Sequence, residues 1–238
     1  METIQTGEGI RRMFSSVYRR YRLINHLLTL GLDILWRRKA ALIAGGVRGG
    51  NWLDICSGTG DMAAGLSGVS PEGTDIYGVD FSLPMLLTAR KDPRTSDVDF
   101  VLADARELPF APESFDLVTI SFSTRNMNLS REILTDTFRG FLRVLKPGGV
   151  LINLETSQPP SAVIRALFHL LVKIYVAPAG RLISGAGPAY RYLSGSIPRF
   201  YPAEQLRKII QEAGFRDVSF RRMTMGAVAL HRAVRPGG

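Results

Sequence analysis

Residues 51–61, with the sequence NWLDICSGTGD, decide the fold of this chain. The first five residues are largely apolar, which is typical of a short buried strand, and the glycine-rich turn after them opens a helical pattern. Asp80 closes the next apolar run, TDIYGVD. A strand, a glycine turn, a helix and then an acid at this distance indicate an α/β sheet with a cofactor site at the turn.

Outward from this turn, apolar runs alternate with helical patterns. Strands are predicted over 51–56, 74–80, 98–104, 115–122 and 150–155, and helices over 10–29, 32–46, 82–91, 130–145 and 161–176. Two more strand-like runs within 215–233 indicate a hairpin at the sheet edge. The expected fold class is therefore α/β, a doubly wound, mostly parallel sheet with helices on both faces.

A single domain is expected over 1–238, because neither an internal repeat nor a low-complexity linker divides the chain. Its expected parts are an N-terminal helical lid (10–45), a cofactor-binding α/β core (46–157), a substrate-side helical insertion (158–200), and a C-terminal helix and hairpin (201–238).

Composition narrows the function classes. The chain has 30 basic and 21 acidic residues, a formal net charge of +9, with the basic excess near its two ends. This balance suits an anionic membrane surface or a nucleic acid. One cysteine, Cys56, and three scattered histidines argue against a disulfide framework and a metal site. Neither a signal peptide nor an apolar run of ~20 residues is visible, so we expect a cytoplasmic protein.

The segment 161–176, SAVIRALFHLLVKIYV, is apolar except for a narrow stripe of Ser161, Arg165, His169 and Lys173, each four residues apart. We expect a helix packed into the core. The alternative is a lid over an apolar ligand, or a membrane-facing helix whose stripe meets headgroups or water. The apolar face also permits a homodimer.

Charge at the glycine turn separates two classes of cofactor. Gly58-Thr59-Gly60 fits a relaxed dinucleotide fingerprint, but Asp54 and Asp61 would repel a pyrophosphate. S-adenosylmethionine reverses this preference, because it has no phosphate and carries an ammonium and a sulfonium. The turn therefore favours the methyl donor, and its glycines let the backbone approach the methionine part closely.

Acids at the ends of successive strands complete the predicted cofactor site. Asp80 is placed to accept hydrogen bonds from the ribose hydroxyls, and Asp104 from the adenine amino group. The predicted cofactor residues are Asp54, Gly58, Thr59, Gly60, Asp61, Asp80, Phe81, Asp104, Ala105 and Ser121.

The glycine turn, both acid positions and VLKPGG resemble class I methyltransferases, and the chain is most similar to the ubiquinone/menaquinone biosynthesis C-methyltransferases. The similarity covers about 14–232, and includes LGLDILWRR, DICSGTGD, VDFSLPML, ADARELPF, ESFDLVTISFSTRN, RVLKPGGVLINLETSQP, AYRYLSGSIPRFYP, EAGF and GAVALHR. Three positions depart from it. Cys56 replaces a glycine common in methyltransferases, Arg22 stands where this family often has aspartate, and Ser123 stands where it usually has glycine.

The resemblance implies a seven-stranded Rossmann-like sheet and transfer of a methyl group from S-adenosylmethionine to a ring carbon of a polyprenylated quinol. It implies Arg125, Asn126 and Tyr21 as catalytic residues, with a water held by Arg125 and Asn126 as the expected proton acceptor. The alternative for Arg125 is a structural role, in an ion pair with Glu155. The apolar tail of the substrate implies peripheral attachment to the inner face of a membrane.

Other functions remain open at this level. The acceptor could be another lipid or a small phenol, and a nicotinamide oxidoreductase is disfavoured by Asp61. A nucleic-acid binder is not expected, because Tyr18 and Tyr21 amid arginines fit the apolar face of a helix equally well. A non-catalytic membrane scaffold would not need the four acids.

Overall fold

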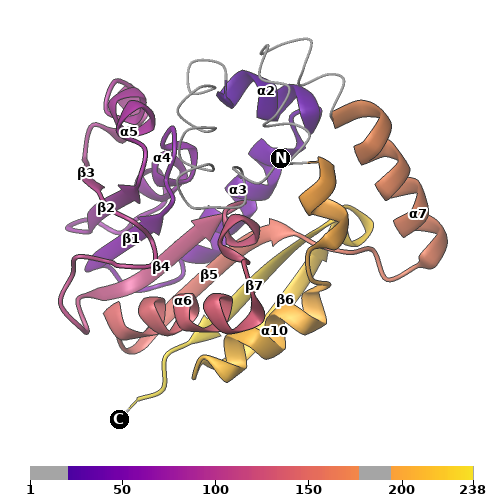
Figure 1. The fold of residues 1–238 in the computed structure, drawn as a ribbon. Coiled ribbons are helices and arrows are strands. Elements are labelled where there is room, and N and C mark those ends of the chain that lie inside the picture. Colours follow the sequence, from indigo (N-terminus) through magenta and orange to yellow (C-terminus); the bar gives the residue numbers. More distant parts are fainter. Residues whose placement is uncertain (1–20, 177–193, 238) are drawn as a thin grey trace.

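The computed structural model describes residues 21–176 and 194–237, apart from the side chains of Tyr21, Ile24 and Val176. A seven-stranded sheet in the order β3-β2-β1-β4-β5-β7-β6 forms its centre (Figure 1). The strands are β1 (Asn51–Ile55), β2 (Asp75–Asp80), β3 (Val98–Leu102), β4 (Phe115–Ser121), β5 (Leu145–Thr156), β6 (Arg216–Met223) and β7 (Val228–Val234). The predicted α/β class and the seven-stranded sheet are confirmed.

Six strands run in the same direction and only β7 is reversed. β1 pairs with β2 on one side and with β4 on the other, so the strand order reverses between β1 and β4. β7 pairs antiparallel with both β5 and β6, which confirms the predicted hairpin at the sheet edge. Ligands of open α/β sheets bind beyond the carboxyl ends of the strands at such a reversal point.

Helices cover both faces of the sheet, and side chains alternate between two cores. The helices are α2 (Tyr21–Leu28), α3 (Leu32–Ala44), α4 (Asp61–Ser67), α5 (Leu83–Ala89), α6 (Arg131–Val144), α7 (Ala162–Leu171) and α10 (Ala203–Glu212). Trp52 of β1 joins the core beneath α3 and α4, whereas Leu53 joins the core beneath α6 and α10. The two-residue period of a strand therefore supplies both cores from one short segment.

Several predicted boundaries need adjustment. β5 begins at Leu145, five residues before the predicted strand, so that KPGG lies inside the element. β3 ends at Leu102 and leaves Asp104 in the following loop. Ser130 caps α6, because its hydroxyl accepts a hydrogen bond from the Ile133 amide. Residues 10–20 of the predicted first helix, and 177–193 of the predicted insertion, lie outside the described residues.

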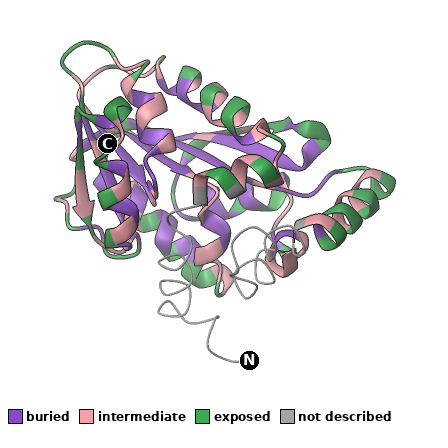
Figure 2. Ribbon diagram, turned by 90° about the horizontal axis from the view of Figure 1, so that it is seen from above, coloured by how far each residue is buried: buried purple, intermediate pink, exposed green. Residues whose placement is uncertain are grey.

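The expectation that the apolar helix near 161–176 packs into the core is wrong. α7 contains no buried residue, and it lies at the periphery of the fold as an exposed and half-exposed ribbon (Figure 2). Four of its large apolar side chains, Val163, Leu167, Leu170 and Leu171, are 50–79% exposed, whereas Ile164 and Phe168 are half-buried. Ile174 of the π-helical turn η3 (Val172–Val176) follows at 62%.

The polar stripe of α7 faces the protein, which is the opposite of the membrane-facing prediction for this stripe. His169 Nε2 donates to Gln158 Oε1 at 2.7 Å, and Arg165 Nη1 donates to the Pro159 carbonyl at 3.2 Å. Lys173 alone of the three basic residues is exposed. Residues 158–160 supply polar partners on the inner side, so the apolar side chains point outward. Within the described ranges, none of the helices is both long and apolar enough to cross a membrane.

His231 of β7 is buried in the protein, and its burial predicts how the stability of the fold depends on pH. It is 1% exposed, and its Nε2 donates to the Ala203 carbonyl at 2.9 Å. Burial lowers the pKa of His231 to about 4, from an ordinary value near 6.5. Below pH 6.5 the unfolded chain takes up a proton that the folded chain refuses, so stability falls as pH drops toward 4.

We expect this one histidine to remove about 3 kcal/mol of unfolding free energy between pH 7 and pH 4. Urea unfolding of His231→Gln, whose amide can also donate to Ala203, should show a pH dependence shallower by that amount. Parallel curves for the two proteins would show that His231 does not titrate as described.

Candidate active site at the carboxyl edge of the sheet

The predicted cofactor residues meet at one edge of the sheet. Asp54 lies on β1, the turn 56–60 follows that strand, and Asp80 ends β2. Asp104 follows β3 and Ser121 ends β4. Because β3, β2, β1 and β4 are adjacent and parallel, their carboxyl ends bring these residues together at the reversal point.

Asp80 ties the glycine turn to the end of β2. Its Oδ2 accepts a hydrogen bond from the Gly58 amide at 2.9 Å, and its Oδ1 accepts one from the Ser82 amide at 2.8 Å. Burial raises the pKa of Asp80 to about 6, although these amides act in the opposite direction. Two backbone donors hold the carboxylate in one orientation, as ribose recognition requires.

The glycines of the turn have backbone conformations that side chains disfavour. Gly58 has φ +56° and Gly60 has φ +82°, and a Cβ at Gly60 would lie 3.1 Å from the Ala89 Cβ. Cys56 adopts φ +55°, which explains why many methyltransferases have glycine there. Phe122, directly after β4, has φ +56°. Left-handed non-glycine residues therefore follow both strands at the reversal point, where strain commonly accompanies function.

Asp54 is buried beneath the turn and is only partly satisfied. The Thr119 hydroxyl donates to its Oδ1 at 2.7 Å, whereas no hydrogen-bond partner reaches its buried Oδ2. Burial raises the pKa of Asp54 to about 7. A buried acceptor left open at this edge fits a cofactor that brings donors, so the residues present suit S-adenosylmethionine.

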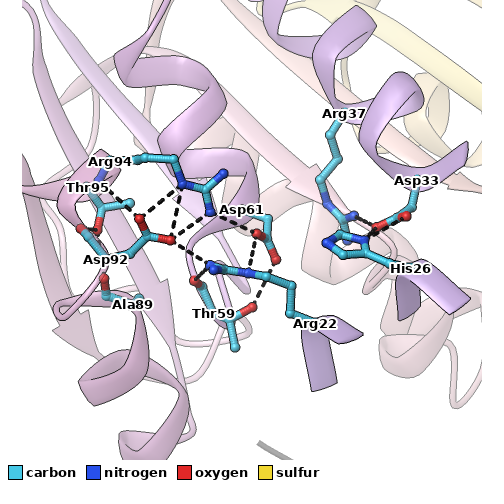
Figure 3. A network of polar contacts seen from close by, with 10 residues as sticks. All are labelled: Arg22, His26, Asp33, Arg37, Thr59, Asp61, Ala89, Asp92, Arg94 and Thr95. Atoms are coloured by element: carbon cyan, nitrogen blue, oxygen red, sulfur yellow. Dashed lines mark hydrogen bonds and ion pairs between the residues drawn. The ribbon is translucent and has the colours of Figure 1, made fainter. Parts of the chain in front are cut away.

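Asp61 is not the isolated negative charge that the sequence interpretation assumed. Arg22 Nε from α2 lies 2.6 Å from its Oδ1, and Arg94 Nη2 lies 3.5 Å from the same oxygen. Asp92 joins both arginines, 2.9 Å from Arg22 Nη2 and 2.7 Å from Arg94 Nη2 (Figure 3). Two carboxylates and two guanidiniums thus balance at the turn, and Arg22 and Arg94 lie too far away in sequence for spacing to reveal them.

The adenine end of the predicted site is also charge-balanced. Asp104 Oδ2 lies 2.7 Å from Arg106 Nη2, and Asp104 Oδ1 accepts a hydrogen bond from the Arg106 amide at 2.9 Å. Ala105 between them is buried. The two-residue spacing is an aspartate turn, a local signal that sequence reading could have identified.

Arg125 and Asn126 lie in a 3₁₀ turn, η2 (Thr124–Met127), that follows β4. Arg125 forms the ion pair with Glu155 that was the alternative to a catalytic role. Its Nη1 lies 3.2 Å from Glu155 Oε1 and donates to the Thr156 hydroxyl at 2.9 Å. Both partners of this ion pair are buried. The buried Oδ1 of Asn126 has no hydrogen-bond partner. Tyr21 begins α2, but its side chain lies outside the described residues.

A second polar group, missed by the sequence interpretation, joins α2 to α3. His26 Nδ1 donates to Asp33 Oδ2 at 2.9 Å, and Arg37 Nη1 lies 2.6 Å from the same oxygen (Figure 3). Asp33 is buried, yet hydrogen bonds from His26 and Thr29 and the charge of Arg37 lower its pKa. The Arg37 guanidinium lies 5.1 Å from the Phe122 ring centre, which fixes this pair of helices beside the end of β4.

Asp80 predicts a pH dependence for cofactor binding. In the predicted cofactor site, ribose hydroxyls would donate to the ionised carboxylate, and bound S-adenosylhomocysteine should then lower the pKa of Asp80 from about 6. Affinity should therefore fall by up to about tenfold per pH unit below 6. Calorimetric titration of Asp80→Asn should show weaker binding and a flatter profile. Asp75→Asn, at the exposed opposite end of β2, is the matched control and should titrate like the wild type.

Comparison with known proteins shows similarity to methyltransferases along nearly the whole chain. The family model described as the ubiE/COQ5 methyltransferase family matches residues 2–235. A "ubiquinone/menaquinone biosynthesis C-methyltransferase UbiE" from Desulfotalea psychrophila is 34% identical over 232 residues, which cover 98% of this chain and 92% of that protein. A "demethylmenaquinone methyltransferase" from Beutenbergia cavernae is 40% identical over 221 residues, covering 93% and 88%.

Solved structures share the fold at much lower identity. The [4+2]-cyclase SpnF superposes with a TM-score of 0.69 at 17% identity, covering 98% of this chain and 97% of that one. A phosphoethanolamine N-methyltransferase 2 from Haemonchus contortus, in complex with S-adenosylhomocysteine, gives 0.58 at 20% identity, covering 84% and 52%. These likenesses show the fold alone. The match over residues 2–235, with relatives 34% and 40% identical along most of their length, shows that the chain belongs to the ubiE/COQ5 methyltransferase family.

Proposed function

We propose that this enzyme methylates a ring carbon of a prenylated quinol in quinone biosynthesis, with S-adenosylmethionine as the methyl donor. One observation carries the acceptor side of the proposal. The cofactor turn follows β1, and η2, which contains Asn126, follows β4. These two strands pair directly, so the two turns lie at the carboxyl ends of neighbouring strands. The names of the curated relatives support the quinone acceptor.

Different residues at the sheet edge would bind different parts of the cofactor. Asp80 would hold the ribose, Asp104 and Ala105 the adenine, and the turn Gly58–Gly60 the methionine part, with Phe81 and Ser121 beside them. The bound donor supplies an electrophilic methyl group on a sulfonium. The protein's own task is to orient the ring carbon and to favour loss of the hydroxyl proton, because an aromatic carbon is a weak nucleophile until its hydroxyl ionises.

Asn126 is the candidate for contact with the acceptor oxygen. Its unpartnered Oδ1 can accept the hydrogen bond of a quinol hydroxyl and so fix the ring beside the cofactor turn. Overall, a carbon–carbon bond forms, the sulfur–methyl bond breaks, and the ring proton leaves to restore aromaticity. A guanidinium stays protonated near neutral pH and has no lone pair free to take that proton. We propose that a water molecule beside Asn126 accepts the ring proton.

Arg125 acts as a positioning residue in this proposal. Its amide donates to Glu155 Oε2 at 3.0 Å, and its side chain reaches Glu155 Oε1 and the Thr156 hydroxyl, so η2 is fastened to β5. Its buried Nε has no hydrogen-bond partner, which leaves one donor for a substrate oxygen or the proposed water. Ser123, which stands where the family usually has glycine, directly precedes this turn. We therefore propose that it affects the choice of methyl acceptor rather than binding of the methyl donor.

The function is tested by offering labelled methyl donor with short-chain prenylated quinols, small phenols and phospholipids. We expect label on a ring carbon of the quinol, located by NMR. Asn126→Ala should lower kcat by about 100-fold while S-adenosylhomocysteine affinity stays unchanged. Asn128→Ala is the matched control from the end of the same turn, where Oδ1 is equally without a partner.

Two results would contradict this proposal. Methylation of a phenol or lipid in preference to every quinol would make the runner-up function, a methyltransferase of another acceptor, the better one. An equal loss in Asn126→Ala and Asn128→Ala would remove the specific role of Asn126.

We also propose that the outward face of α7 attaches the enzyme to the membrane surface that holds the prenylated quinol. Val163, Leu167, Leu170, Leu171 and Ile174 recur at helical spacing on one side, while the polar stripe is turned inward. α2 lies beside this segment, because the Tyr175 hydroxyl donates to the Leu27 carbonyl at 3.1 Å. Exposed Leu23, Leu27 and Leu30 extend the apolar surface on that side.

Vesicle co-sedimentation tests the attachment. Leu167→Gln/Leu171→Gln should reduce partitioning onto anionic vesicles by about tenfold or more, because each buried leucine contributes about 1.5–3 kcal/mol. Leu87→Gln, which is exposed on α5 in the cofactor half, is the control and should bind normally. The net charge of +9 predicts weaker binding at high salt. Binding that ignores both salt and anionic lipid content would count against this attachment. A dimer in ultracentrifugation that the double variant dissociates would favour a homodimer face instead.

A further inference from the structure

Arg22 brings a positive charge from the N-terminal helix to the cofactor turn. Its Nε lies 2.6 Å from Asp61 Oδ1, and its Nη2 donates to the Thr59 carbonyl at 2.8 Å and lies 2.9 Å from Asp92 Oδ2. These contacts cross 37 residues of sequence to Thr59. The sequence interpretation of the turn considered acids only, and so left this cation out.

Asp61 is held in place independently of Arg22. It is the first residue of α4, and its Oδ2 accepts the Thr59 hydroxyl at 3.0 Å. Arg22 and Asp61 both keep part of their side-chain surface open, 33% and 16% respectively. A ligand at the turn can therefore reach both members of the ion pair.

The methyl donor ends in an α-amino acid, which carries an ammonium and a carboxylate on the same carbon. A turn with acids alone would attract the first and repel the second. An adjacent carboxylate and guanidinium match both charges, because the ammonium can exchange for one partner of Asp61 and the carboxylate for one partner of Arg22. No net charge needs to be stripped of its partner in this exchange.

We propose that Arg22 and Asp61 together bind the amino-acid end of the cofactor, with Arg22 donating to its carboxylate and Asp61 accepting from its ammonium. Arg22 is therefore a positioning and specificity residue that docks α2 onto the cofactor turn. The assignment rests on the proposed methyl donor but not on the proposed quinol acceptor.

Arg94 has a different role in the same cluster. Its Nε and Nη2 form a fork on Asp92 at 3.0 and 2.7 Å, its Asp61 contact is longer at 3.5 Å, and its side chain is 57% exposed. Arg94 thus orients Asp92, which in turn holds Arg22 Nη2 at the turn. Arg90, the exposed residue at the C-cap of α5, is the matched control, because within the described part of the chain it forms no ion pair with Asp61 or Asp92.

Three probes separate the charges of the ligand. S-adenosylhomocysteine carries both charged groups, its decarboxylated analogue keeps only the ammonium, and 5′-methylthioadenosine lacks both. For Arg22→Gln, calorimetry should give about tenfold or greater loss of S-adenosylhomocysteine affinity and little change for the other two probes. Asp61→Asn should weaken both ammonium-bearing probes and spare 5′-methylthioadenosine. Arg90→Gln should change S-adenosylhomocysteine affinity by less than about threefold.

Specific outcomes would overturn the proposal. Unchanged or tighter S-adenosylhomocysteine binding by Arg22→Gln would make Arg22 a competitor for Asp61 rather than a ligand group. An equal loss of affinity for all three probes would assign Arg22 to folding of the turn. In that case Arg22→Lys, which keeps the charge, should not selectively recover the affinity for S-adenosylhomocysteine. The readouts need no acceptor, so a wrong quinol assignment leaves them intact. Failure of the wild type to bind S-adenosylhomocysteine would overturn the methyl donor and this proposal together.

Discussion

The hydrogen bonds from the Gly58 and Ser82 amides to the carboxylate of Asp80 are the interaction on which the site depends. They join the turn after β1 to the turn after β2, directly beside the reversal of strand order. Both amides belong to loops that would otherwise leave backbone donors unsatisfied near the core. The same carboxylate therefore closes the fold at this edge and presents its remaining lone pairs to a ligand.

Charge at this edge is compensated more fully than the sequence suggested. Burial raises the pKa of Asp54 to about 7 and that of Asp80 to about 6, so Asp54 carries only part of a negative charge near neutrality before a ligand binds. Arg22 and Arg94 neutralise Asp61 and Asp92. The acids at this turn therefore do not by themselves exclude a pyrophosphate. The family match supports the methyl donor on independent grounds.

Polarity in α7 is arranged in the reverse of an ordinary surface helix. Arg165 and His169 of its polar stripe meet Pro159 and Gln158, whereas four of its large apolar side chains, and Ile174 just after it, are exposed. Such an orientation has a free-energy cost in water, because apolar area stays hydrated. An apolar partner removes that cost, and a substrate with a prenyl tail supplies a reason for the partner to be a bilayer.

The sequence by itself determined the sheet, the cofactor edge and the family. Apolar runs of strand length, the glycines at 58 and 60, and an acid at 80 are local patterns, and their meaning does not depend on distant residues. Sequence could not decide the orientation of α7, because a stripe of four polar side chains is equally compatible with facing water or facing a polar loop. Nor could it pair Arg22 with Asp61, or turn Arg125 toward Glu155 rather than toward the substrate. Those outcomes depend on which side chains from remote segments compete for each charge, and only the tertiary structure sets those distances.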